Sequence, residues 1–398
     1  MVAGLLPGVR VLDVGQGISA PYCAKILAQM GAEVIKVEPL EGDEARRMGP
    51  FPGDSPHPEK SGLFLALNCS KKGVTLDLKK AAGKNIFLEM LGWADVVIEN
   101  FQPRVMASLG LDYDTLRDVK PELVMTSISN FGQTGPYRDY TAREINLYAL
   151  GGLMYITGDP GREPLQMGVR LAQYGAGQNG FVGTMCALWH RDGTGQGQHV
   201  DVAISEYLST ILENALSQYS YTGSNFRRTG NRGYGRAAWG PYPCKDGYVG
   251  VIAGPDHKWP EVAELMQIGA LTDPKFDDRE GRGANADELD ALMLPWLMEH
   301  GKREIFEMAQ EMGLAFAYIA SPEDILGWEH LREREYFAKV FHPVAGELEY
   351  PAGPYQPQGI KWQLDPAPTL GQHNHEVYGE LLGYSREDLV RLREMGVV

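Results

Sequence analysis

The alternation of short apolar runs with helical patterns in the N-terminal half is the feature that most limits how this chain can fold. Apolar runs predict strands at 9–14, 33–37, 73–78, 95–98 and 123–128. The segments between them predict helices at 21–30, 80–93, 105–109 and 115–119. Strands that alternate with helices of this length form a parallel sheet that is covered on both faces. We therefore expect an α/β fold.

The pattern changes after the first half of the chain. Further helices are predicted at 145–150, 177–190 and 205–216, with a strand at 199–203. Between 224 and 240 the composition shifts to Arg, Gly, Asn and Tyr, which indicates a linker or a binding loop. Strand and helix signals return over 245–330 and predict a smaller second domain. The tail predicts two helices, with Ser385 as the N-cap of the second.

Charge and cysteine usage limit the classes of partner. The formal net charge is −15, which argues against a nucleic-acid binder. Residues 1–104 hold 12 Lys and Arg against 12 Asp and Glu, so an anionic ligand would meet least repulsion there. The four cysteines have no metal-binding spacing and suit a reducing compartment. No apolar run is long enough for a membrane span, and we expect a cytoplasmic protein without a metal site or a membrane partner.

Two local patterns bear on ligand binding. The turn after the first strand, Gly15 to Ala20, has two glycines of a dinucleotide-binding motif and lacks the third, so a tight turn is favoured over a nucleotide site. Basic and amide side chains follow neighbouring strands, where an open α/β sheet binds its ligands. These are Lys71, Lys72, Lys79, Lys80, Asn100 and Arg104. They fit a phosphorylated ligand or an exposed basic loop, and spacing alone does not decide between the two.

Ordered motifs along nearly the whole chain resemble the class III CoA-transferases. The matching stretches are VRVLDVGQGISAPYCAKILAQMGAEVIKVEP, LNCSKKGVTLDLK, ADVVIENFQP, GLDYDTL with KPELVMTSISNFGQTGPY, RDGTGQGQHVDVAISE, TGNRGYG, PCKDGYV and LGQHNHEVYGELLGYSREDLVRLREMGVV. The family includes formyl-CoA transferase, carnitine CoA-transferase and α-methylacyl-CoA racemase. Eight segments in the same order make a chance similarity implausible.

The resemblance implies a fold and a chemistry. It implies a large Rossmann-like domain built from residues 1–223 and 331–398, and a linker with a small α+β domain over 224–330. It also implies two subunits threaded through each other as interlocked rings. Coenzyme A and acyl-CoA are substrates, with no covalently bound cofactor. In such transferases an aspartate attacks the thioester to give a mixed anhydride, and the returning CoA thiolate gives an aspartyl-CoA thioester.

The chain departs from this pattern at the nucleophile. Gln173 lies at the position of the family aspartate, and a neutral amide cannot cycle through an anhydride and a thioester. The racemase branch is also unsupported, because Arg143 replaces its histidine and a guanidinium cannot shuttle a proton at neutral pH. Glu144 matches an acidic position that family members use beside the nucleophile.

The positions that match CoA-binding residues are mixed. Leu76, Lys79, Asn100 and Phe101 match family positions near the adenosine and phosphate groups. Ile18 replaces a glutamine of formyl-CoA transferase, and Ser108 and Thr141 replace basic residues. Arg104 would restore one cation from a neighbouring position. The resemblance therefore predicts a site that keeps its scaffold and has lost its nucleophile and part of its hold on CoA.

Our leading hypothesis is the non-nucleophilic subunit of a heteromeric transferase, paired with a paralogous subunit that carries the aspartate. By analogy with anaerobic aromatic degradation, it favours succinyl-CoA as donor and an aryl-substituted succinate such as benzylsuccinate as the acceptor acid. The aromatic side chains that could line an acceptor pocket are Tyr174, Tyr219, Tyr221, Tyr234 and Trp239. Two alternatives stay open: an inactive homodimer that binds CoA ligands, and a homodimeric enzyme that uses Glu144.

Overall fold

The structure is a computed structural model that describes residues 4–232, 235–353 and 355–398. The chain divides into two compact units. The large unit combines residues 1–153, 167–213 and 332–398, and the small unit combines 154–166 and 214–331. Within the described residues, no helix combines the length and the apolar character needed to cross a lipid bilayer.

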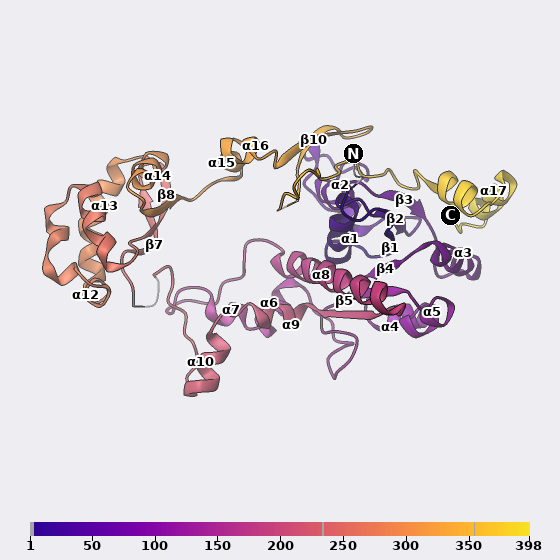
Figure 1. Ribbon diagram of the computed structural model, residues 1–398, viewed down its shortest axis with the longest axis horizontal. Coiled ribbons are helices and arrows are strands. Elements are labelled where there is room, and N and C mark those ends of the chain that lie inside the picture. Colours follow the sequence, from indigo (N-terminus) through magenta and orange to yellow (C-terminus); the bar gives the residue numbers. More distant parts are fainter. Residues whose placement is uncertain (1–3, 233–234, 354) are drawn as a thin grey trace. The chain divides into compact units, whose positions relative to one another are not determined.

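A parallel sheet of six strands forms the centre of the large unit (Figure 1). Its strands are β1 (Arg10–Asp13), β2 (Glu33–Glu38), β3 (Lys72–Thr75), β4 (Val96–Glu99), β5 (Val124–Ser129) and β6 (His199–Ala203). Their order is β3-β2-β1-β4-β5-β6, and every neighbouring pair is parallel. The expected α/β class is confirmed. The strand order reverses direction between β1 and β4, where such sheets bind ligands beyond the strand ends.

Helices connect these strands. They are α1 (Ser19–Gln29), α2 (Gly62–Asn68), α3 (Ala81–Trp93), α4 (Arg104–Leu109), α5 (Tyr113–Val119), α6 (Glu144–Leu150), α7 (Leu153–Ile156), α8 (Leu171–Thr194) and α9 (Ile204–Thr210). They lie close to the predicted places except for α2 and α7, which were not predicted. The prediction for α8 was wrong at its start. The helix begins six residues before 177, and Gln173 therefore lies in its first turn rather than in the preceding loop.

Glycines explain why the start of α8 was missed and why the helix packs closely against its neighbours. Glycine weakens a helix in isolation, so Gly175 and Gly177 hide the first turn of α8 in the sequence. In the fold, Gly177 and Gly180 let α8 approach its neighbours closely. A Cβ atom at Gly177 would lie 2.5 Å from the Ser19 carbonyl of α1, and one at Gly180 would lie 2.8 Å from Ile128 of β5. Tertiary packing therefore overrides the local preference.

The predicted helix over 205–216 is also corrected. The structure has two helices there, α9 and α10 (Ala215–Thr222). Glu213 between them adopts a left-handed conformation with φ of 54°. A non-glycine residue in that region cannot continue a right-handed helix, so the segment breaks at this point.

The C-terminal segment returns to the free edge of the large sheet. After the hairpin of β10 (Phe337–His342) and β11 (Gly346–Pro351), the chain runs alongside β3. The His373 ring and the Asn374 amide accept hydrogen bonds from the backbone of Gly73 and Thr75, at 2.9 Å each. A π-helical turn (His375–Leu381) and α17 (Arg386–Glu394) follow. The prediction that Ser385 caps the last helix is confirmed by its bond from the Asp388 backbone.

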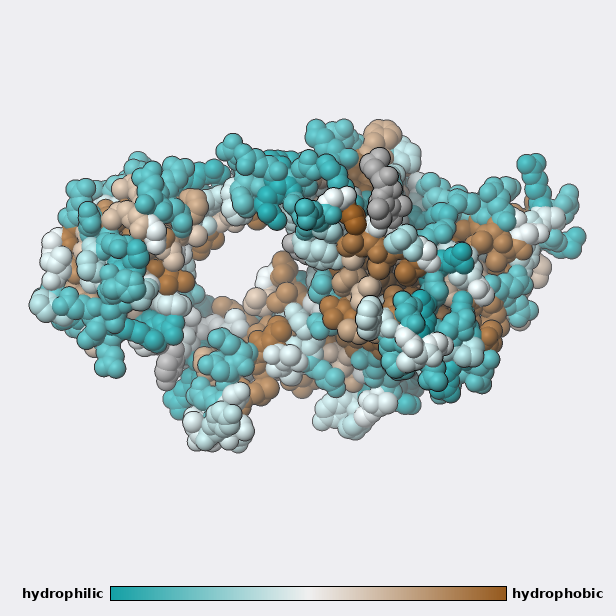
Figure 2. Space-filling model, in the orientation of Figure 1, coloured by the Kyte–Doolittle hydropathy of each residue, from teal (hydrophilic) through white to brown (hydrophobic). Residues whose placement is uncertain are grey.

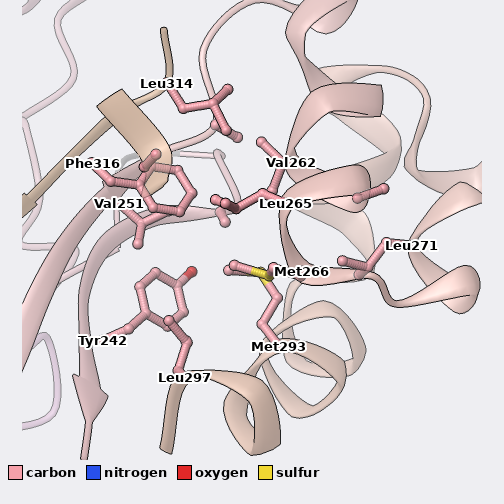
Figure 3. Packing of buried hydrophobic residues seen from close by; sticks show 14 of the residues in the cluster. Tyr242, Val251, Val262, Leu265, Met266, Leu271, Met293, Leu297, Leu314 and Phe316 are labelled. Carbon is pink, nitrogen blue, oxygen red and sulfur yellow. The ribbon is translucent and has the colours of Figure 1, made fainter. Parts of the chain in front are cut away.

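The small unit packs helices against an antiparallel sheet of β7 (Trp239–Cys244), β8 (Gly247–Ile252) and β9 (Ala315–Tyr318). Its longer helices are α11 (Trp259–Met266), α13 (Ala286–Glu299) and α14 (Lys302–Glu311), and α12 (Arg279–Ala284) and α15 (Pro322–Leu326) are shorter. Figure 3 shows the shared core, in which Tyr242 and Val251 of the sheet meet Leu265, Met266 and Met293 of the helices. The unit therefore has a hydrophobic core of its own.

Candidate functional site

A pocket lies where the strand order reverses, beyond the carboxyl ends of β1, β4 and β5. Its volume is about 70 Å³. Its lining includes Asn100 and Phe101 after β4, Ser129 at the end of β5 and Gln173 from α8. The fold thus brings three of the predicted residues, Asn100, Phe101 and Gln173, to one place. A volume of this size suits a small polar group rather than a whole CoA molecule.

Asn100 fixes the turn between β1 and α1. Its side-chain oxygen accepts a hydrogen bond from the Gln16 backbone N–H at 2.8 Å, and its amide nitrogen donates to the Gln16 carbonyl at 2.7 Å. The same nitrogen donates to the Ser19 hydroxyl at 3.0 Å. The amide thus uses both of its ends on the protein, and it holds one wall of the pocket in place.

A buried network of charged side chains holds the backbone of the same turn in place. Lys71 donates to Asp13 at 2.8 Å, and Lys36 pairs with Asp43 at 2.7 Å. Lys36 also donates to the Gly15 carbonyl, and Asp43 accepts the Gly17 N–H at 2.9 Å. Burial lowers the pKa of Lys71, whereas Lys36 and these hydrogen bonds overcome the effect of burial and lower the pKa of Asp43. These cations are inside the protein and cannot meet a phosphate.

Gln173 reaches the pocket from the N-terminal turn of α8, and Glu144 holds that turn. The Glu144 carboxylate accepts the backbone N–H of Ala172 at 2.9 Å, one residue before Gln173. Its second oxygen is buried and has no hydrogen-bond partner among the described residues. Burial and the nearby Glu144 raise the pKa of Tyr148 to about 12. Glu144 therefore acts as a capping carboxylate for the helix that presents Gln173.

Glu99 positions the loop that carries Phe101. Its side chain is 3% exposed and accepts the Phe101 backbone N–H at 2.7 Å. Burial raises the pKa of this carboxyl to about 7. Beside it, the Ser127 hydroxyl is bonded to the ring of His199 at 2.9 Å. The carboxyl does not line the pocket, so its effect on a ligand passes through the Phe101 loop.

The other residues suggested by the resemblance lie outside this lining. Ile18 is buried at the start of α1, and Leu76 belongs to the hydrophobic core of the sheet. Lys79 is exposed on the turn before α3. Arg104 is exposed on α4, and its guanidinium lies 3.3 Å from Asp139. Arg104 therefore lies beside the loop that carries Asp139 and Arg138.

The sequence reasoning missed six polar residues of the pocket, which are Ser19, Gln102, Ser129, Asn130, Arg138 and Tyr140. Ser129 is the last residue of β5, Asn130 follows it, and Arg138 comes from the next loop. The Ser129 hydroxyl is buried, yet it has no hydrogen-bond partner among the described residues. An unpaired buried hydroxyl costs free energy unless a ligand or water satisfies it. For Ser129 and Asn130, their place at a strand end was the available signal.

The aromatic residues predicted for an acceptor pocket are scattered. Tyr174 of α8 packs edge-on against Tyr22 of α1, with ring centres 5.0 Å apart. Tyr219 and Tyr221 are exposed on α10, and Trp239 lines pockets of the small unit. Tyr234 lies outside the described residues.

The lining of the pocket limits its chemistry. Among the described residues, it contains amides, hydroxyls and one guanidinium, and it contains no carboxylate, imidazole or thiol. Hydroxyl, amide and guanidinium groups can donate hydrogen bonds to a carbonyl or a carboxylate. Serine and tyrosine hydroxyls are present, but the described lining places no carboxylate or imidazole beside them to act as a base. The lining is therefore suited to hydrogen-bond a carbonyl or a carboxylate.

Curated proteins similar to the chain are CoA-transferases. Succinyl-CoA–D-citramalate CoA-transferase of Chloroflexus aurantiacus is 34% identical, over 99% of this chain and 98% of that protein. The alpha subunit of succinyl-CoA–L-malate CoA-transferase of the same species is 32% identical, over 99% and 92%. Subunit BbsE of succinyl-CoA:(R)-benzylsuccinate CoA-transferase of Thauera aromatica is 31% identical, over 98% and 97%.

A solved structure agrees with this family relationship. A CaiB/BaiF family protein from Brucella suis superposes with a TM-score of 0.86 at 28% identity, over 95% of this chain and all of that one. The sequence pattern of CoA-transferase family III matches residues 6–374. The chain therefore belongs to CoA-transferase family III, the class III CoA-transferases, whose members take CoA thioesters as substrates.

Proposed function

We propose that this chain is the non-nucleophilic subunit of a heteromeric class III CoA-transferase. One observation carries the proposal: Gln173, which the resemblance assigns to the position of the family's aspartate, lines the pocket at the strand reversal. A carboxylate can form an anhydride and regenerate itself, whereas an amide cannot. A paralogous partner with an aspartate would supply the covalent step, and this chain would supply the scaffold that pairs with it.

The relatives support the donor and the kind of acceptor. Each of the three names succinyl-CoA, and two of them are named as subunits. Malate, citramalate and benzylsuccinate are all succinates with substituents on the carbon chain. The proposed reaction is therefore transfer of CoA from succinyl-CoA to a substituted succinate, with benzylsuccinate as the aryl-substituted acceptor to test first.

The test compares the chain alone with the chain co-purified with a paralogue that carries the aspartate. Exchange between succinyl-CoA and benzylsuccinate is followed by chromatographic detection of benzylsuccinyl-CoA. We expect turnover by the pair and none by the single chain. Turnover by the single chain would overturn the non-nucleophilic role. A stable pair that exchanges no CoA with any substituted succinate would instead favour a binding or scaffold protein.

Substitution of Gln173 gives an independent control in the same experiment. If the pocket is intact, Gln173→Asp should form an acyl or CoA adduct at residue 173 that hydroxylamine releases. Gln173→Asn changes the length of the side chain without adding a carboxylate and should form none. Mass spectrometry of the residue 173 peptide reads both results. An adduct in the Asn variant would show that the reactive group lies elsewhere.

A further inference from the structure

A second pocket lies in the small unit, apart from the site described above. Its volume is about 420 Å³, which is within the range of pockets that bind small organic molecules. The loop before β7 supplies Arg236 and Ala238, β7 supplies Trp239, the end of β8 supplies Ile252, and α12 supplies Arg279 and Arg282. The pocket therefore combines cationic groups with an indole ring and small apolar side chains.

The three arginines have different surroundings. Arg282 is buried, donates to the carbonyls of Ala237 and Phe276, and pairs with Asp256 at 2.7 Å. The Arg282 side chain therefore holds the wall of the pocket together and is already fully engaged by the protein. Arg236 stacks over the Trp239 ring at 4.3 Å, and neither Arg236 nor Arg279 forms an ion pair with any residue that the structure describes. Two guanidinium groups are therefore available at the pocket.

The absence of ion pairs at Arg236 and Arg279, among the described residues, is unusual because the small unit has an excess of acidic residues. The small unit contains 12 Lys and Arg against 20 Asp and Glu, so acidic partners are plentiful. Other arginines of the unit use them. Arg232 pairs with Asp287 at 2.7 Å, and Arg303 pairs with Asp324 at 3.0 Å. The lining holds three arginines against one carboxylate, that of Asp256, which pairs with Arg282. Its net positive charge is thus a local exception in an acidic unit, as expected for an anion-binding site.

We infer that this pocket binds the carboxylate of an organic acid, with Arg236 and Arg279 holding the carboxylate. A guanidinium matches a carboxylate in a planar, two-bonded geometry. The Trp239 ring and the wall of Ala238 and Ile252 would contact the hydrocarbon part of the acid, for which the volume leaves room. The inference is separate from the proposed function, because it concerns binding by this unit and requires no CoA exchange.

Isothermal titration calorimetry on the full chain, alone or with its partner subunit, tests the inference with benzylsuccinate as the probe. We expect binding that Arg236→Ala and Arg279→Ala each weaken about tenfold or more. Arg236→Lys should fall between, because it keeps the charge and loses the planar fork. Arg303→Ala is the matched control. It removes an arginine of the same unit that also lies near an aromatic ring, Tyr318 at 5.3 Å, and should leave the affinity unchanged.

Adenosine 3′,5′-bisphosphate tests whether the pocket binds phosphate groups instead of a carboxylate. It carries phosphates of the kind found in CoA and no acyl group. Competition between it and benzylsuccinate, lost in Arg236→Ala, would overturn the assignment to an organic acid. Equal affinity for benzylsuccinate in the parent chain and both alanine variants, each with an unchanged thermal unfolding midpoint, would also overturn it. A pair without transferase activity would leave this binding test intact.

Discussion

At the scale of single residues, the loop beside the pocket depends on a carboxyl that is buried without a counter-ion. Burial raises the pKa of Glu99 from its ordinary 4.5 to about 7, while the carboxyl accepts the Phe101 N–H. Between these two pH values the folded state keeps a proton that the unfolded chain has released. The free energy of unfolding contributed by this group is therefore greatest at low pH and falls as the pH rises toward 7.

We predict that replacing Glu99 with glutamine removes this dependence. Relative to Glu99→Gln, the parent chain should lose about 1.4 kcal/mol of unfolding free energy per pH unit between pH 4.5 and 7. Urea unfolding at several pH values measures the difference. Glu122→Gln, at an exposed position, should follow the parent chain. Parallel pH profiles for the parent and Glu99→Gln would contradict the raised pKa.

The residue scale also shows where sequence reasoning stopped. Gln173, Asn100 and Phe101 could be selected because family motifs flank them. Arg138 could not, because its place in the lining depends on a loop that meets the strand ends only in three dimensions. Lys71 was expected either to meet a phosphorylated ligand or to lie in an exposed basic loop, and the structure instead buries it against Asp13, Pro21 and Asn68. A lysine beside a strand end looks the same in a sequence whether it faces solvent or the core.

At the scale of elements, strands and helices of the N-terminal half were predictable because each apolar run is short and bounded by turn residues. The start of α8 was not, because its glycines serve tight packing rather than local helix preference. That helix start is also the element that positions Gln173. The backbone of that helix start is held by Glu144. The resemblance to the family suggests only that Glu144 lies beside the nucleophile position.

We predict that Glu144 is a capping residue of α8. Glu144→Ala removes the acceptor of the Ala172 N–H and should lower the free energy of unfolding by about 1 kcal/mol. Glu144→Gln keeps an acceptor oxygen and should lower it less. Urea unfolding measures both changes. Exchange by the subunit pair should survive Glu144→Gln, because a capping oxygen suffices. Complete loss of exchange in Glu144→Gln, with stability retained, would point to Glu144 as the reacting carboxylate.

At the scale of the whole molecule, the large unit exposes apolar side chains along one face of α8. Val182 is 50% exposed and Trp189 is 83% exposed, and they are separated by two helical turns. Ile145 and Leu150 of α6 are also exposed, and Figure 2 shows apolar surface over α6 and α9. Large apolar patches on a protein surface commonly mark sites of interaction with another protein. The proposed heteromer needs an interface, and this face is the candidate that the side chains offer.

We predict that charge on this face weakens subunit association while the same change elsewhere does not. Trp189→Glu should weaken association of the pair at least tenfold, because a buried aromatic anchor commonly contributes about 2 kcal/mol or more. Val182→Asp should also weaken it at least tenfold, because it would bury an unpaired carboxylate in an apolar interface. Val390→Asp is the matched control, since Val390 of α17 is 59% exposed and lies far along the chain. Sedimentation of the purified pair over a range of concentrations measures the three constants. Equal weakening by Val182→Asp and Val390→Asp would remove α8 from the interface and leave the partner to be sought on another face.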